Sequence, residues 1–181
     1  MMRVCIIWKI EVKIEVENMK KKPKKTKLSD EIIRAIYGNR TVEIDNWISK
    51  EGVGTVDNDG RNIVIHSLLA KNIIVLKLAL GHQEDPNTKD RTGWYPLHYA
   101  AQDNSVEAAD ILIQNGAIID SEDDYGNTPL WRAVFSYNGS GEMIEFLLKR
   151  GADLNHNNHS QVSPSKLANT IANYDVRKFF Q

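Results

Sequence analysis

The stretch DRTGWYPLHYA at residues 90–100 decides the fold, because related stretches recur along the chain. DNDGRNIVIHS stands at residues 57–67, and DDYGNTPLWRA stands at residues 123–133. The glycine at the fourth position of each stretch follows the previous one at an interval of 33 residues. A fixed period of this length is typical of a solenoid, in which each repeat is one supersecondary unit stacked on the next.

Each copy predicts a turn followed by two helices. The pattern Asp-x-x-Gly favours a tight turn, because glycine tolerates positive φ, and the recurring acid is a turn former. In the third copy Thr128 stands at the N-cap, and Pro129 stands in the first helical turn, where it loses no hydrogen bond. The matching segments 106–117 and 142–152 predict second helices that end at Gly-Ala, with the glycine in the left-handed conformation.

Some copies depart from the pattern. The first copy has Asn62-Ile63 where the third has Thr-Pro, so its first helix is expected to start loosely. Trp131 occupies the position of the histidine in the second copy. A degenerate fourth copy surrounds Pro164, but Gln161 replaces the turn glycine, which weakens the prediction of a hairpin and indicates the end of the stack.

These stretches resemble the ankyrin repeat. The resemblance rests on Pro96-Leu97-His98 followed by Ala100 and Ala101, and on Thr128-Pro129-Leu130 followed by Ala133. It implies an all-α fold with short β-hairpin loops: an α-solenoid of about three full repeats with capping helices at both ends.

The resemblance covers residues 28–181 and divides the chain. Residues 1–27 form a basic leading segment, and residues 28–181 form the repeat domain. Within that domain we expect a helix pair at 28–56, repeats at 57–89, 90–122 and 123–157, and a C-terminal cap at 158–181.

The leading segment 1–27 carries a formal charge of +6, and the rest of the chain carries −7. Apolar residues alternate over Val4–Val16, which favours a half-buried strand; alternatively, residues 1–18 are a mis-assigned leader and translation starts at Met19. The run KKKPKKTK at 20–27 is either an arm for phosphates or an acidic partner, or a solvated tail.

Composition excludes several classes of protein. Hydrophobic residues make up 41% and charged residues 26%, which is a soluble globular balance. One cysteine excludes a disulfide framework, and no apolar run approaches the roughly 18 residues of a membrane span. We therefore expect a cytoplasmic monomer that contacts no membrane.

No catalytic constellation stands out, so we expect no enzyme, cofactor, metal or small-molecule substrate. Cys5 has no evident activating partner, and His156 with His159 is short of the three or four ligands of a zinc site. By the resemblance His98 is structural. His66 falls one position later in its copy and is expected to be partly exposed.

The resemblance implies a concave binding surface made by hairpin tips and inner helices. The candidate partner-binding residues are Arg61, Arg91, Trp94, Gln102, Asp103, Asp124, Tyr125, Asn127 and Phe135. Trp, Tyr and Arg dominate interface energies, and Asp103, Asp123 and Asp124 are expected to form an acidic rim. Trp94 either contacts the partner or folds back onto Tyr95.

We therefore expect a non-enzymatic protein–protein interaction module. The chain resembles small bacterial ankyrin proteins, some of which are immunity proteins that bind and block a toxin. The alternatives are a general adaptor or scaffold, and a nucleic-acid or membrane-surface binder that uses Lys20–Lys27. The acidic body of the protein makes nucleic acid the weaker choice of partner.

Overall fold

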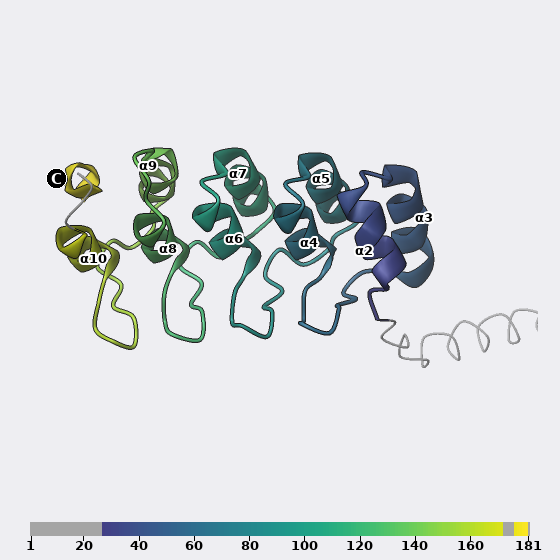
Figure 1. Ribbon diagram of the computed structural model, residues 1–181, viewed down its shortest axis with the longest axis horizontal. Helices are drawn as coiled ribbons and strands as arrows, with labels where there is room; N and C mark the ends of the chain where they lie inside the picture. The colour runs from purple at the N-terminus through teal and green to yellow at the C-terminus, as the bar shows by residue number, and fades with distance from the viewer. Residues whose placement is uncertain (1–26, 172–175, 181) are drawn as a thin grey trace, which may run out of the picture.

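The computed structural model describes residues 27–171 and 176–180, and the regular elements in these residues are all helical. They follow one another as α2 (Asp30–Tyr37), α3 (Thr41–Glu51), α4 (Ile63–Leu69), α5 (Ile73–Gly81), α6 (Pro96–Gln102), α7 (Val106–Gln114), α8 (Pro129–Phe135), α9 (Glu142–Lys149), α10 (Pro164–Thr170) and the 3₁₀ helix η1 (Val176–Phe180). Helix pairs stack along the long axis, and loops project from the side of α4, α6, α8 and α10 (Figure 1). The all-α solenoid is confirmed.

Each of the first three projecting loops is closed by its turn acid, and the fourth is closed by Asn158. The N–H of Asp90 donates to the carbonyl of Trp94 at 3.0 Å, and its Oδ1 accepts the N–H groups of Thr92 and Trp94 at 2.8 and 2.9 Å. The same two backbone bonds to Oδ1 recur at Asp57, Asp123 and Asn158. The periodic acids are therefore turn formers, as predicted.

The turn glycines are needed because successive loops stack closely. Gly93 has φ +84°, and a Cβ there would lie 2.5 Å from the backbone nitrogen of Asp124 in the next loop. A Cβ on Gly126 would lie 2.8 Å from the His159 ring and 3.0 Å from its backbone nitrogen, and a Cβ on Gly60 would lie 3.3 Å from the backbone nitrogen of Arg91. The three glycines thus lie at matching points on successive layers. A side chain would clash at Gly93 and Gly126, and the positive φ favours glycine at all three positions.

Helix α4 begins firmly, so the expected loose start is wrong. The Oδ1 of Asn62 accepts the N–H of Ile65 at 3.0 Å, which is an N-cap bond. The Nδ2 of Asn62 donates to Thr88 Oγ1 at 3.0 Å. Asparagine caps a helix as well as threonine does, and here its amide also ties α4 to the following loop.

The fourth loop is formed, although Gln161 replaces its glycine. Gln161 takes φ +60°, the N–H of Asn158 donates to the carbonyl of Val162 at 3.2 Å, and the N–H of His159 donates to the carbonyl of Tyr125 at 3.0 Å. These bonds and the packing of α10 on α8 hold the left-handed glutamine in place. The weakened prediction of a hairpin here was wrong.

The two ends of the stack are closed differently. At the start, Leu28 is fully buried and its N–H donates to the carbonyl of Val56 at 3.1 Å. At the other end η1 buries Val176, and the Phe179 ring lies edge-on to Tyr137 with 5.9 Å between centroids. A Cβ on Gly141 would overlap the Phe179 ring, so the loop before α9 is shaped to receive η1.

The core runs between the two rows of helices. Small residues such as Ala100, Ala101 and Ala133 are buried there, and they let neighbouring helices approach closely. Among the described residues, no helix has the length and apolar character needed to cross a membrane.

Candidate interaction surface

A side chain on each of the inner helices α4, α6 and α8 fastens that helix to its own loop. It stands nine positions after the turn acid and contacts the second carboxylate oxygen: His66 Nε2 lies 2.9 Å from Asp57, Tyr99 donates its hydroxyl to Asp90, and Arg132 donates to Asp123 at 3.2 Å. The three acids hold three chemically different partners at one repeated position. Comparing the copies at this position could have found the set from the sequence.

Burial and hydrogen bonding set the charges of these groups. Burial lowers the pKa of His66 and of His98, which favours neutral imidazoles. Burial opposes the charge of Asp90, but the hydrogen bonds from Tyr99 and from two backbone N–H groups outweigh it, and the pKa of Asp90 lies below its ordinary value. Burial and the neighbouring Asp90 raise the pKa of Tyr99 to about 12. The carboxylate therefore stays ionised and the phenol stays protonated.

Trp94 joins two repeats. Its ring lies edge-on to Tyr99 of the same repeat, with 5.1 Å between centroids, and the guanidinium carbon of Arg132 in the next repeat lies 4.2 Å from its centroid. Trp94 remains partly exposed. The contact between Trp94 and Arg132 is a cation–π interaction, which fixes the indole across the boundary between two layers.

Arg132 extends this contact to two further rings. Trp131 and Phe135 are stacked at 5.2 Å with an interplanar angle of 13°, and the guanidinium carbon of Arg132 lies 5.7 Å from the Phe135 centroid. We call Trp94, Tyr99, Trp131, Arg132 and Phe135 the aromatic–arginine cluster. Phe135 is 58% exposed, so the cluster presents an apolar ring to solvent.

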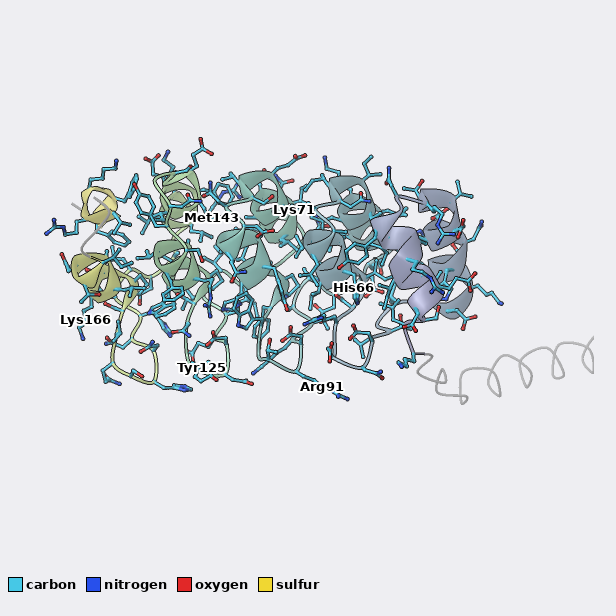
Figure 2. All side chains as sticks on the ribbon, in the orientation of Figure 1. His66, Lys71, Arg91, Tyr125, Met143 and Lys166 are labelled. Atoms are coloured by element: carbon cyan, nitrogen blue, oxygen red, sulfur yellow. The ribbon has the colours of Figure 1, made fainter. Side chains whose placement is uncertain are left out.

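Tyr125 and Arg91 lie at the ends of projecting loops, where Figure 2 labels both. Tyr125 is 69% exposed, and Arg91 is also exposed. Gln102, Asp103 and Asp124 are exposed as well. These five predicted residues are accessible to a partner.

Two of the predicted positions are not on the open surface. Asn127 is only 5% exposed; its Nδ2 donates to Asp123 at 3.0 Å, and its Oδ1 accepts from Asn158 Nδ2 at 2.8 Å. The exposed position predicted for Asn127 is wrong, because its amide joins neighbouring loops. Arg61 is half-buried, with its Nη1 atom 3.4 Å from Asp59.

His66 was also expected to be partly exposed, and it is only 4% exposed. Its bond to Asp57 draws the imidazole in against the loop, and the Tyr37 ring lies edge-on to it at 6.4 Å between centroids. Tyr37 itself is 56% exposed. The repeat pattern gives no signal for Tyr37, because Tyr37 belongs to the first helix pair, which lacks the signature stretch.

The rim is mixed in charge, which corrects the predicted acidic rim. Asp123 is 3% exposed and occupied by hydrogen bonds. Asp103 pairs with Lys71 at 3.4 Å, and Asp124 pairs with Lys89 at 2.7 Å. Carboxylates and ammonium groups therefore alternate beside the aromatic–arginine cluster.

The remaining polar clusters form no metal site in the part of the chain that the structure describes. His156 pairs with Glu122 at 3.1 Å, and His159 is exposed on the fourth loop. Cys5, the alternating segment Val4–Val16 and residues 20–26 of the lysine-rich run lie outside the described residues.

Comparison with known proteins gives a consistent family match. A family model described as "Ankyrin repeats (3 copies)" matches residues 64–158. An ankyrin repeat protein of Rickettsia conorii is 39% identical over 70 residues, which are 36% of this chain and 99% of the relative.

Two further relatives match over part of their length. Protein phosphatase 1 regulatory subunit 27 of Mus musculus is 32% identical over 80 residues, covering 44% of this chain and 52% of that protein. Transient receptor potential cation channel subfamily A member 1 of Homo sapiens is 36% identical over 84 residues, covering 45% of this chain and 7% of the channel subunit. This chain thus spans from a small fraction to about half of the length of these two relatives.

Proposed function

Because this chain belongs to the ankyrin-repeat family, we propose that it is a non-enzymatic module that binds a partner protein through its hairpin tips and inner helices. Ankyrin repeats indicate protein–protein interaction. The observation that carries the proposal for this surface is the aromatic–arginine cluster, which presents Phe135 and lies among accessible loop-tip residues.

The cluster has the properties of an interface anchor. Tyr99 is held by Asp90, and Arg132 is held by Asp123, so neither side chain has much freedom left to lose on binding. Trp94 packs between them. Preorganised Trp, Tyr and Arg residues are the types that contribute most to binding energy.

The partner's polar groups would meet the mixed rim. The ion pairs of Asp103 with Lys71 and of Asp124 with Lys89 are partly exposed. Exposed pairs of this kind contribute little stability by themselves, so they can exchange partners at small cost. A partner with both charge signs around an apolar centre fits this surface better than a purely basic one.

The more specific form of the proposal is an inhibitor that blocks a toxin by covering its active site. A preorganised surface with an exposed apolar anchor supports steric occlusion as the mechanism. The test is co-expression in a bacterial host with the product of a neighbouring gene that is toxic by itself. Rescue of growth by the wild type, and not by a cluster variant, is expected. Equal growth with and without the wild type would contradict this form.

The broader proposal is tested by replacing the partly exposed Trp94 and the exposed Tyr125. Trp94→Ala with Tyr125→Ala should weaken binding to a partner identified by affinity capture by at least about 30-fold, because truncating interface anchors costs about 2 kcal/mol or more. Isothermal titration calorimetry measures the change. The matched control is Gln114→Ala, which alters an exposed residue on α7. Unchanged affinity in a folded double variant would refute the proposal.

A further inference from the structure

A cavity of about 260 Å³ lies between the layer of α4 and α5 and the layer of α6 and α7. Its floor includes Leu68, Leu76, Ala100 and Ala108, which are each 7% exposed or less. Lys71 and Asp103 line it as well, and their side chains are 75% and 37% exposed, which places them at the mouth. The cavity is thus an apolar recess with a charged rim.

Ala108 explains why the recess occurs in this layer. The corresponding residue is Val75 in the preceding repeat, 33 positions earlier, and Met143 in the following repeat, 35 positions later. Val75 and Met143 are both buried, and Met143 is labelled in Figure 2. Larger side chains therefore occupy this position in the neighbouring layers, whereas Ala108 leaves space.

Three of the polar side chains that line the recess already donate hydrogen bonds, whereas Ser105 lines it without a side-chain bond to its own helix. Ser67 Oγ donates to the carbonyl of Val64 at 2.6 Å, and Asn72 Nδ2 donates to the carbonyl of Ile36 at 3.2 Å. The Tyr99 hydroxyl donates to Asp90. A polar guest would lose its hydration without gaining hydrogen bonds from these three side chains, and most of the remaining buried lining is apolar, so the interior favours an apolar guest.

The charged rim favours an apolar guest that is attached to a peptide backbone. Lys71 Nζ and Asp103 Oδ2 lie 3.4 Å apart at the mouth, and both side chains reach solvent. An ammonium donor beside a carboxylate acceptor matches the carbonyl and N–H of a peptide backbone. Asp103 also belongs to the predicted partner surface, so a bound polypeptide can reach both.

We propose that this recess is a socket for one apolar side chain of the partner polypeptide. The inference rests on the proposed function and adds the chemistry of one contact. A cavity of 150 Å³ is large enough for benzene, so this recess accepts an aromatic side chain as large as indole. Lys71 and Asp103 bind the backbone on either side of that residue.

The first experiment uses indole and toluene as side-chain probes on the full chain. Saturable shifts of the Leu68, Ile73 and Ala108 amide signals are expected in ¹H–¹⁵N NMR spectra, with no such shifts from acetamide as a polar probe. Ala108→Met should abolish the shifts by filling the recess, as Met143 does in the next layer. Gln114→Met adds the same side chain at an exposed position of α7 and should leave the shifts unchanged.

If Ala108→Met does not fold, Ala108→Val replaces it in the same experiment. This smaller variant introduces the side chain that Val75 has in the preceding repeat. Absence of saturable shifts with either apolar probe overturns the inference. Shifts that persist in a folded Ala108→Met or Ala108→Val protein overturn it as well. Trp94→Ala should keep the probe shifts, so this measurement is independent of the proposed function.

The second experiment uses the partner identified by capture. Ala108→Met should weaken that complex by at least about tenfold. If Trp94→Ala with Tyr125→Ala weakens the complex while Ala108→Met leaves its affinity unchanged, the socket is refuted and the proposed function stands. If indole binds wild type but filling the recess leaves the partner's affinity unchanged, the recess is a small-molecule site and the inference falls.

Discussion

The carboxylate of Asp90 accepts two backbone N–H groups through one oxygen and the Tyr99 hydroxyl through the other. Asp90→Ala leaves these donors without their acceptor, so we expect a loss of roughly 2–4 kcal/mol in the free energy of unfolding. Asp90→Asn should cost less, because Asn158 binds two backbone N–H groups with a carboxamide oxygen. Urea denaturation measures both, with the exposed Asp103→Ala as control. An equal loss in the two Asp90 variants would contradict this account.

The buried imidazoles predict how stability changes with pH. Burial lowers the pKa of His66 and His98 below the ordinary value of 6.5, so the unfolded chain binds these protons more readily than the folded chain. Their contribution is fully present above pH 6.5 and is lost as pH falls through 6.5 toward the lower pKa of the folded state. Melting temperatures between pH 7.5 and 5.5 should therefore decrease on acidification.

The variant His66→Gln isolates one of these two contributions. Its melting temperature should depend less steeply on pH than that of the wild type over the same interval. Gln102→Ala, at an exposed position, should keep the wild-type slope. A slope equal to that of the wild type in His66→Gln would show that the buried His66 imidazole does not contribute.

Single positions were the least predictable part of the sequence. The repeat alignment placed Tyr125 and Phe135 on the surface, where they lie, but it also placed Asn127 there. Whether a loop residue points outward depends on partners 31 residues away, such as Asn158 for Asn127. No local pattern contains that information. Arg132 was missed because its role comes from Trp94 in the preceding repeat.

At the scale of elements, η1 depends on a glycine in the loop before α9. Gly141→Ala would place a methyl group in the space of the Phe179 ring, and η1 should detach from its position beside Tyr137. We expect a loss of about 1–3 kcal/mol, as for overpacked sites. Hydrogen-exchange measurements should show faster amide exchange in α9 and α10, and unchanged exchange rates in α2 to α4.

A double-mutant cycle tests the same contact. Phe179→Ala removes the ring that Gly141 accommodates, so adding Gly141→Ala to it should cost little more. Two independent losses that simply add would show that Gly141 and Phe179 are not coupled. Gly139→Ala would not be a suitable control, because Gly139 has φ +109°.

The helices were more predictable than the capping and turn residues at their ends. The 33-residue period and the Thr-Pro and Gly-Ala signals located both helices of the central repeats. The missing Thr-Pro predicts a loose start for α4, but Asn62 supplies an equivalent N-cap. The missing glycine predicts that the fourth loop is poorly formed. Stacking on the third loop nevertheless stabilises Gln161 in its left-handed conformation.

For the whole molecule, stability depends on contacts between neighbouring layers. Helix α6 packs on α4 and α8, and α7 packs on α5 and α9. Leu112→Ala, in a fully buried position of α7, should cost about 2–5 kcal/mol and reduce cooperativity, because the middle of a linear array couples its two ends. Leu167→Ala, half-buried in the terminal layer, should cost less.

Chemical denaturation followed by tryptophan fluorescence measures this difference. The four tryptophans include Trp47 near one end and Trp131 toward the other. A broader transition in Leu112→Ala than in Leu167→Ala is expected. Transitions of equal midpoint and width in the two variants would contradict a chain of neighbouring couplings.

The repeated position nine residues after each turn acid gives the surface a direction. Passing from one layer to the next, it carries His66, then Tyr99, then Arg132, each held by its own aspartate. A ligand displaced by one layer would exchange the partly exposed phenol of Tyr99 for the partly exposed cation of Arg132, or would meet neither at the layer of the buried His66. The backbone of the stack is periodic, but the side chains at this repeated position differ from layer to layer. A ligand shifted by one layer therefore loses matching contacts, and one register is preferred.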